Sequence, residues 1–334
     1  MASALENWGE ILRTQNLSPD KPMDLVSRWL LITRASVFPM TLTSGAIGGL
    51  LAIGAPDTNW LYFAAALVGL LVAHAANNMI NDYFDLESGV DTASYVRAQY
   101  APHPVLSGLI SKSGLILAIA VVNLIDLGIL VFLTDQRGWP VALLAMLGLF
   151  VSVFYVAPPL QLKHRGLGEP GVFLVWGPLM IGGTYFVTAG KLPPWVLVAS
   201  IPYALLVTTV LMGKHVDKLE ADAAKGIRTL PVILGRERGL FLTQQLLVSF
   251  FVFVLSLVLV GTLSLWTLLV FLAVPRLWQV LKVLARPRPE RAPPNYPLWP
   301  LWYVAWCFLV TRRAGALFVL GLVLDAIFPA HLRT

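Results

Sequence analysis

The 334-residue sequence is poor in charged residues and in cysteine. Only 13% of its residues are charged, well below the roughly 25% of an average soluble domain, and this scarcity excludes an ordinary soluble fold. Its one cysteine, Cys307, cannot form an intramolecular disulfide and has no metal-ligand neighbours in the sequence. By contrast, 57% of the residues are hydrophobic and the mean hydropathy is +0.74. This composition predicts an integral membrane protein.

Nine apolar stretches follow one another along the chain. They are continuous rather than alternating, and they exceed the 9 to 11 residues, roughly, of a transmembrane strand, so they predict an all-α, multi-pass helical bundle. The largely polar residues before them predict a segment, 1–25, with no signal peptide, and a single transmembrane domain at 26–330. The aromatic-rich residues 298–311 suit an interfacial helix or the first half of the last span. The nine predicted spans are residues 29–54, 61–84, 114–134, 139–158, 171–188, 195–213, 240–261, 264–285 and 314–330.

Positively charged residues are concentrated on alternate loops between these spans. If the N-terminus lies inside, the inner segments contain nineteen Lys and Arg residues and the outer segments three, which are Arg137, Lys191 and Arg333. The positive-inside rule therefore predicts a cytoplasmic N-terminal segment and cytoplasmic cap loops at 85–113 and 214–239. The net charge of +6 follows from this topology. It does not indicate nucleic-acid binding, because the basic residues are not gathered in one stripe.

Carboxylates and amides gather at the cytoplasmic end of the second predicted span. Asn78, Asp82 and Asp85 are spaced i, i+4 and i+7 and therefore lie on one face of a helix. A carboxylate near the bilayer centre costs roughly 2.5 to 3.5 kcal/mol on insertion scales. Several of them together predict a hydrated cavity, a divalent cation, or both.

A second acidic cluster follows the sixth predicted span, where Asp217, Glu220 and Asp222 are interspersed with basic residues. Because both clusters are on the same side, they are predicted to be two halves of a pseudo-repeat that face one cavity. Mg²⁺ bridges carboxylates to phosphorylated substrates, and basic side chains bind phosphate oxygens. In a membrane protein this combination indicates a lipid diphosphate. The basic residues concerned are Arg97, Lys112, Lys163, Arg165, Lys214, Lys218, Lys225 and Arg228.

Other interpretations of these residues stay open. A single acidic residue at a helix end is commonly a solvated boundary, and a single basic residue on an inner loop commonly contacts lipid headgroups. A transporter or channel for a cation or an anionic lipid would also use carboxylates, although it would place them near mid-membrane on several spans. Of the histidines, His74 is interpreted as a packed helix residue, whereas His215 is a weaker functional candidate because it lies near Asp217.

Four segments resemble the motifs of a known family, the UbiA-type intramembrane prenyltransferases. Residues 81–85, Asn-Asp-Tyr-Phe-Asp, followed by Asp91, resemble its first aspartate-rich motif. Residues 217–222, continued by 226–230 and 234–235, resemble its second motif. Residues 34–39 and 155–163 agree with the family as well. The likeness covers residues 30–240 and keeps the order of the motifs.

The resemblance implies a nine-helix bundle with a central cavity that opens laterally to the lipid. In it, Mg²⁺, with Mn²⁺ as an alternative, would be held by Asp82, Asp85, Asp217 and Asp222 and would bind the diphosphate of a polyprenyl diphosphate. An aromatic acceptor would then attack the allylic carbocation in a dry apolar tunnel. The resemblance assigns supporting or catalytic roles to Asn78, Asn81, Asp91 and Tyr155, and substrate-binding roles to Arg34, Arg97, Lys163, Lys218, Glu220 and Arg228.

The two motifs depart from the family pattern. In the first, Gly89 stands where the last acid is commonly found, and Asp91 supplies the carboxylate instead. In the second, the acids are usually four residues apart, whereas Asp217 and Asp222 are five apart and would diverge by about 140 degrees on a regular helix. The helix is therefore expected to break there, or Glu220 to replace one of these acids.

The likeness is greatest to the menaquinone-pathway branch of the family, whose members prenylate 1,4-dihydroxy-2-naphthoate. It rests on the spacing of Gly89 and Asp91 and on residues 108–111, 165–169 and 183–190. It implies an enzyme in the cell membrane of a prokaryote. Because no short motif specifies the acceptor pocket, other acceptors stay open: 4-hydroxybenzoate, homogentisate, a chlorophyllide or a glyceryl phosphate. A terpene cyclase on the same scaffold, which needs no external acceptor, stays open too.

Overall fold

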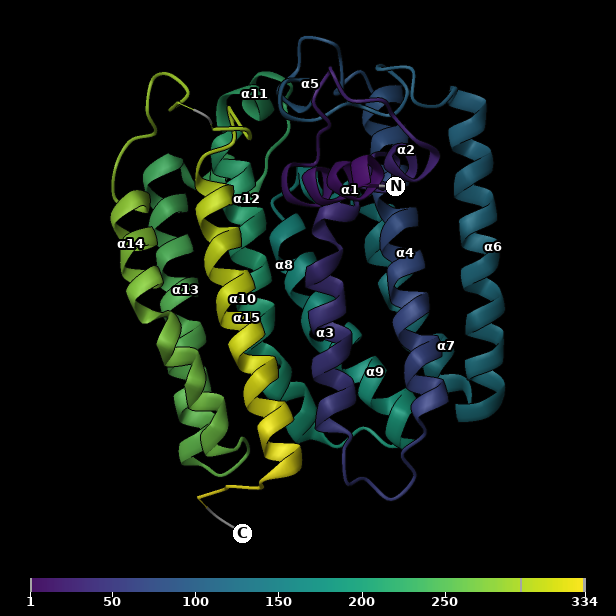
Figure 1. Ribbon diagram of the computed structural model, residues 1–334, viewed down its shortest axis with the longest axis vertical. Helices are drawn as coiled ribbons and strands as arrows, with labels where there is room; N and C mark the ends of the chain where they lie inside the picture. The colour runs from purple at the N-terminus through teal and green to yellow at the C-terminus, as the bar shows by residue number, and fades with distance from the viewer. Residues whose placement is uncertain (1, 295, 333–334) are drawn as a thin grey trace.

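The computed structural model describes residues 2–294 and 296–332, which form a bundle of roughly parallel helices (Figure 1). These residues contain no β-strand, and a single isolated bridge pairs Arg165 with Arg228, so the prediction of an all-α fold is confirmed. The longer helices are α3 (Phe38–Leu51), α4 (Trp60–Glu87), α6 (Lys112–Arg137), α7 (Trp139–Phe154), α9 (Met180–Ala189), α10 (Pro194–Asp217), α13 (Arg236–Leu259), α14 (Val274–Leu284) and α15 (Tyr303–Ile327). Helix α1 (Ala2–Thr14) is of similar length to α3. The shorter ones are α2 (Leu25–Ile32), η1 (Ala35–Val37), α5 (Val96–Tyr100), η2 (Leu162–His164), α8 (Gly168–Leu174), η3 (Val175–Leu179), α11 (Leu219–Ala224), α12 (Leu230–Leu234) and η4 (Leu265–Ala273).

Seven helical segments of the described chain are long and apolar enough to cross a membrane, which agrees with an integral membrane protein. An eighth span results if α2 is joined to η1 and α3, which are bent by 66° relative to it. The stretch predicted at 139–158 forms α7, whose 16 residues fall short of the roughly 20 that a spanning helix needs. The nine predicted stretches are therefore largely helical, and the ninth span stays a prediction.

The last span differs from its prediction. A span was expected at 314–330, but α15 begins at Tyr303 and ends at Ile327. Of the aromatic-rich residues 298–311, those from Tyr303 on therefore form the first turns of the last span, which is one of the two alternatives considered. Trp299 and Trp302 precede the helix in a non-helical segment. Arg312 and Arg313 interrupt the apolar run of this helix. The Arg312 guanidinium lies 4.4 Å from the centroid of the Phe308 ring, so the helix continues through the two charges.

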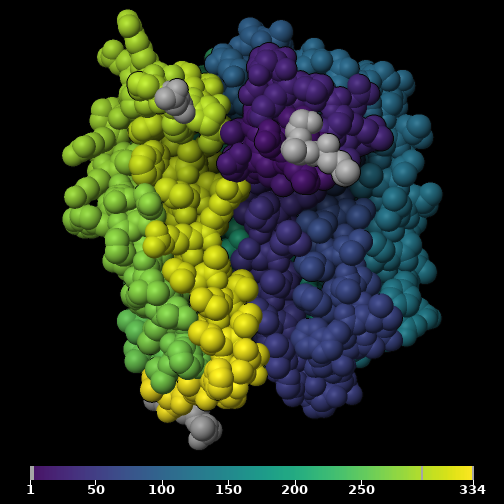
Figure 2. Space-filling view, in the orientation of Figure 1, coloured from purple at the N-terminus to yellow at the C-terminus, as the bar shows by residue number. Residues whose placement is uncertain are grey.

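Short helices cover one end of the bundle. Helices α1, α2, α5 and α11 lie together at the upper end in Figure 1, and the N-terminal segment, purple in Figure 2, covers this end beside α15. The segments predicted as cap loops, 85–113 and 214–239, are thus partly helical, since α4 and α10 extend into them and α5, α11 and α12 lie within them.

Two local features bring the functional segments together. The chain turns between α2 and α3 at Arg34, whose φ of 54° and ψ of 48° are left-handed, a conformation that costs a non-glycine residue free energy. On α10, a Cβ at Gly213 would lie 2.9 Å from the Cα of Val304. The absent side chain therefore lets the end of α10 lie directly against the start of α15, and the second acidic cluster begins there.

Candidate functional site

A cavity of about 430 Å³ lies among α4, α6, α7, η3, α9 and α10, with fewer residues from α3 and α8. Its volume is within the usual range of roughly 300–1,000 Å³ for small-molecule sites. Its walls are predominantly apolar. Polar side chains line the end nearest the predicted motifs, and they are Arg34, Asn77, Asn78, Asn81, Ser152, Tyr155 and Lys214. The cavity therefore has the shape of an apolar pocket with a polar mouth, which suits a ligand with an apolar chain and a charged head.

Asp82 is the most deeply buried acid of the first cluster, with no exposed surface. Its carboxylate accepts from the Arg34 guanidinium, with Nε 3.2 Å from Oδ2 and a second nitrogen on Oδ1. Arg97 Nε lies 3.6 Å from Oδ1. A buried carboxylate is expensive unless it is paired, and here two arginines that lie far apart in the sequence provide the charge. The structure thus brings together three of the predicted site residues.

Asp82, Asp91 and His103 offer ligand atoms that all lie within 4.8 Å of one another. His103 Nε2 is 3.9 Å from Asp82 Oδ1 and 3.6 Å from Asp91 Oδ2. Burial and the nearby charges of Asp85 and Asp82 raise the pKa of Asp91, a repulsion that a bound cation would relieve. Two carboxylates suit a divalent cation such as Mg²⁺ or Mn²⁺, so these residues fit a metal centre. The sequence interpretation missed His103, whose only signal was its place in the loop after the motif.

Asp85 is joined to Lys163, another predicted residue. The Lys163 ammonium lies 2.8 and 2.7 Å from the two carboxylate oxygens, and Lys163 is buried. The backbone N–H of Lys163 donates to the carbonyl of Tyr155 over 3.0 Å, which ties this lysine to the end of α7. Gly168 lies against the Tyr155 ring, since a Cβ there would be 3.0 Å from Cε2. Tyr155, which lines the cavity, therefore connects its polar mouth to the Lys163–Asp85 pair.

The two predicted amides have different surroundings. Asn78 donates to the carbonyl of Thr33 over 2.9 Å, so it holds α4 against the end of α2. Asn81 also lines the cavity, and its buried Oδ1 has no hydrogen-bond partner among the described residues. A buried polar atom without a partner costs free energy. Asn81 is thus the amide that is available to a ligand.

The second cluster does not assemble as predicted. Asp222 is buried and accepts from the Tyr95 hydroxyl at Oδ1, and Lys218 Nζ lies 3.3 Å from the same oxygen. Burial acts to raise the pKa of Asp222, but the charges of Lys218 and His215 and the Tyr95 hydrogen bond lower it overall. Burial likewise acts to lower the pKa of Lys218, and Asp222 raises it overall. The pair is therefore ionised on both sides.

Asp217 and Glu220 have partners of their own. Asp217 accepts from the backbone amides of Tyr303 and Val304 over 2.9 and 3.0 Å, so both of its oxygens satisfy amides at the start of α15. Glu220 is exposed and pairs with Arg236. Helix α10 ends at Asp217 and α11 begins at Leu219. The break that was expected from the five-residue spacing is therefore present.

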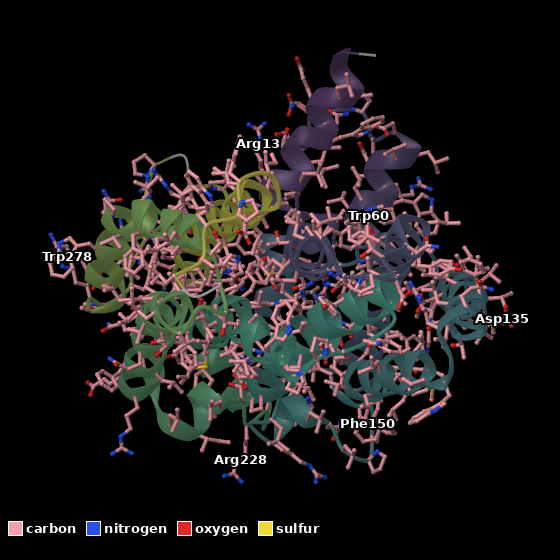
Figure 3. The ribbon with its side chains drawn as sticks, turned by 90° about the horizontal axis from the view of Figure 1, so that it is seen from below. Arg13, Trp60, Asp135, Phe150, Arg228 and Trp278 are labelled. Atoms are coloured by element: carbon pink, nitrogen blue, oxygen red, sulfur yellow. The ribbon has the colours of Figure 1, made fainter. Side chains whose placement is uncertain are left out.

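Arg228 is the predicted diphosphate contact that the structure does not bring into the site. It is exposed, and it lies at the edge of the molecule when the bundle is seen from below (Figure 3). The other cations that were assigned a substrate-binding role are all buried, and they are Arg34, Arg97, Lys163 and Lys218. Of the further basic residues considered for phosphate binding, Lys112, Arg165 and Lys225 are exposed as well.

A buried pair that the sequence interpretation only half identified lies nearby. His215 Nδ1 is 2.6 Å from Glu169 Oε1, and both residues are buried. Glu169 Oε2 has no hydrogen-bond partner among the described residues. His215 was a weak candidate, and Glu169 was noted only as part of residues 165–169. The one indication of Glu169 in the sequence was an acid at the start of an apolar stretch.

Comparison with known proteins gives concordant matches. The model of the UbiA prenyltransferase family matches residues 41–304. The chain is 29% identical over 243 residues to a 1,4-dihydroxy-2-naphthoate octaprenyltransferase of Bacillus subtilis, covering 71% of this chain and 77% of that protein. It is 25% identical over 251 residues to UbiA prenyltransferase domain-containing protein 1 of Dictyostelium discoideum, covering 73% and 75%.

Solved structures share the fold. A UbiA homolog from Archaeoglobus fulgidus bound to GPP and Mg²⁺ superposes with a TM-score of 0.61 at 18% identity, covering 87% of this chain and 99% of that chain. The apo structure of a UbiA homolog from Aeropyrum pernix K1 gives a TM-score of 0.65 at 15% identity, covering 87% and 98%.

Proposed function

The chain belongs to the UbiA prenyltransferase family and is an intramembrane prenyltransferase, and we propose that it transfers an isoprenoid chain from a polyprenyl diphosphate to 1,4-dihydroxy-2-naphthoate. One observation carries the proposal: the ion pairs of Asp82 with Arg34 and of Asp85 with Lys163 adjoin the polar mouth of an apolar cavity through Arg34 and Tyr155, which line it. Family membership favours transfer chemistry over the transporter alternative.

The proposed metal centre lies at the first cluster. Asp82 and Asp91 would hold Mg²⁺, with Mn²⁺ as an alternative, and Asp85 would support them from the next turn of α4. When bound, the metal supplies positive charge that stabilises the departing diphosphate. The support for a divalent metal is the donor set itself and the relatives solved with Mg²⁺ and with Cd²⁺.

The chain's own residues would bind and orient the donor. Arg34, Arg97 and Lys163 lie beside the acids and would hold diphosphate oxygens, while the cavity walls exclude water from the isoprenoid chain. The allylic C–O bond breaks, its electron pair stays with the diphosphate, and a ring carbon of the acceptor bonds to the resulting carbocation. The ring then loses a proton to the diphosphate. Tyr155, at the mouth, is placed to face the carbocation with its π-electrons.

The acceptor and the location are the finer parts of the proposal. The naphthoate acceptor is supported by the 29% identical Bacillus subtilis relative and by the spacing of Gly89 and Asp91. A prokaryotic cell membrane, with the N-terminus and the polar mouth on the cytoplasmic side, is supported by the distribution of Lys and Arg.

An acceptor panel tests this function. Purified protein in detergent is incubated with Mg²⁺, a labelled polyprenyl diphosphate, and 1,4-dihydroxy-2-naphthoate, 4-hydroxybenzoate, homogentisate, a chlorophyllide or a glyceryl phosphate. Prenylated naphthoate is the expected product. A prenylated product with another member of the panel would reassign the acceptor, and free terpene would indicate a cyclase. Absence of metal-dependent diphosphate release with every donor would refute the prenyl-transfer chemistry.

A further inference from the structure

The second acidic cluster has no pair of carboxylates to offer a cation. Both oxygens of Asp217 accept from backbone amides of α15, and Glu220 is exposed and paired with Arg236. Asp222 is the buried acid of this cluster whose carboxylate pairs with a basic side chain, that of Lys218. Within the described residues, the single group of acids and histidines with metal-binding geometry is the one formed by Asp82, Asp91 and His103.

Lys218 already places a positive charge beside the Asp222 carboxylate. Its Nζ lies 3.3 Å from Asp222 Oδ1 and 4.7 Å from the centroid of the Tyr95 ring. The Tyr95 hydroxyl donates to the same Oδ1. Asp222 Oδ2 alone is left without a partner among the described residues. One or two carboxylates can bind Mg²⁺, but an ammonium group 3.3 Å from one oxygen of the single available carboxylate repels a cation there.

We propose that the Lys218 ammonium group takes the place of a second divalent cation, so that the protein binds one divalent cation per chain, at Asp82 and Asp91. The proposal rests on the proposed function, because it concerns the neutralisation of the same diphosphate. Lys218 is a buried, permanently present cation, held by Asp222 on one side and by the face of Tyr95 on the other. The diphosphate would then be neutralised by one exchangeable ion and by fixed side chains.

The test counts bound metal rather than product. Mn²⁺ bound per full-length chain is measured by equilibrium dialysis in detergent at saturating inorganic pyrophosphate, with the bound pyrophosphate counted in the same samples. We expect one Mn²⁺ in the unchanged protein and in Asp222→Asn, and none in Asp82→Asn. Glu220→Gln is the matched control within the cluster, and it should also bind one.

A second variant tests whether Lys218 excludes a second divalent cation. Lys218→Asp places a carboxylate one helical turn before Asp222, and we expect the count to rise from one to two. Lys218→Arg keeps the positive charge and should keep the count at one. If Lys218→Asp does not fold, as judged by its helical circular dichroism, the Mn²⁺ counts of Asp222→Asn and Glu220→Gln still test the inference.

Two outcomes would overturn the inference: two Mn²⁺ per unchanged chain with one lost in Asp222→Asn, or a single Mn²⁺ that is lost in Asp222→Asn and kept in Asp82→Asn. An unchanged chain that binds pyrophosphate but no Mn²⁺ would refute the metal centre of the proposed function, and with it the expected count of one.

Discussion

Asp82 is the residue on which the proposed chemistry depends most. It is fully buried and has two arginines and His103 around its carboxylate, so it links the proposed metal to the cations that would bind diphosphate. Asp82→Asn keeps the shape of the side chain and removes its charge. We expect turnover to fall by about 100-fold or more, the scale of losing one preorganised electrostatic contact.

The measurement for Asp82→Asn is kcat at saturating Mg²⁺, with helical content followed by circular dichroism. Asp135→Asn is the control, because Asp135 is an exposed acid near the far end of α6 and should leave kcat unchanged. Turnover of Asp82→Asn equal to that of the unchanged protein would remove Asp82 from the site.

The grouping of single residues into a site was predictable where these residues lie on one helix. Asp82 and Asp85 share a face of α4, and their periodicity within the sequence was enough to place them at one site. His103 and Glu169 were not identified, because each acquires its role through a tertiary contact, with Asp91 and with His215 respectively. No spacing rule within a segment reports such contacts.

At the scale of helices, Asp217 shows how one side chain can belong to the fold rather than to the site. Its partners, Tyr303 and Val304, come 86 and 87 residues later, which is why the acidic pattern alone favoured a metal role. A helix begins with several backbone N–H groups that have no partner within the helix. Asp217 satisfies two of them, and the early start of α15 depends on this contact.

Asp217→Ala should therefore lower stability more than it changes metal binding. We expect a loss of about 0.5–2 kcal/mol, the usual cost of removing a capping side chain, because two buried N–H groups lose their acceptor. The readout is the thermal unfolding midpoint in detergent, together with the Mn²⁺ count described above. Asp217→Asn keeps an acceptor oxygen and should recover part of the loss. An unchanged midpoint and a lost Mn²⁺ would show that Asp217 is a metal ligand.

At the scale of the whole molecule, the apolar stretches were enough to predict a helical membrane protein, because bilayer thickness sets the length of its helices. The cavity was not predictable in detail. Its walls come mainly from α4, α6, α7, η3, α9 and α10, and which face of each helix turns inward depends on how all of them pack. Asp126 is an example: it lies in the middle of α6 and lines the cavity, yet the sequence interpretation did not single it out.

Asp126 is expected to limit the length of the isoprenoid chain. Its Oδ1 would lie 3.3 Å from a Cβ at Gly69, and Gly69 is roughly 20 Å along α4 from Asp82 at 1.5 Å per residue. A carboxylate deep in a membrane costs roughly 2.5 to 3.5 kcal/mol, and an isoprenoid chain that passes it would displace water from the carboxylate and increase that cost. Asp126→Leu should therefore raise kcat/KM for long polyprenyl diphosphates relative to geranyl diphosphate by several-fold, since about 1.4 kcal/mol corresponds to a tenfold change in such a ratio.

Asp135→Leu is the matched control on the same helix (Figure 3) and should leave this ratio unchanged. A ratio in Asp126→Leu that stays constant, or that shifts toward the short donor, would show that the chain does not pass Asp126.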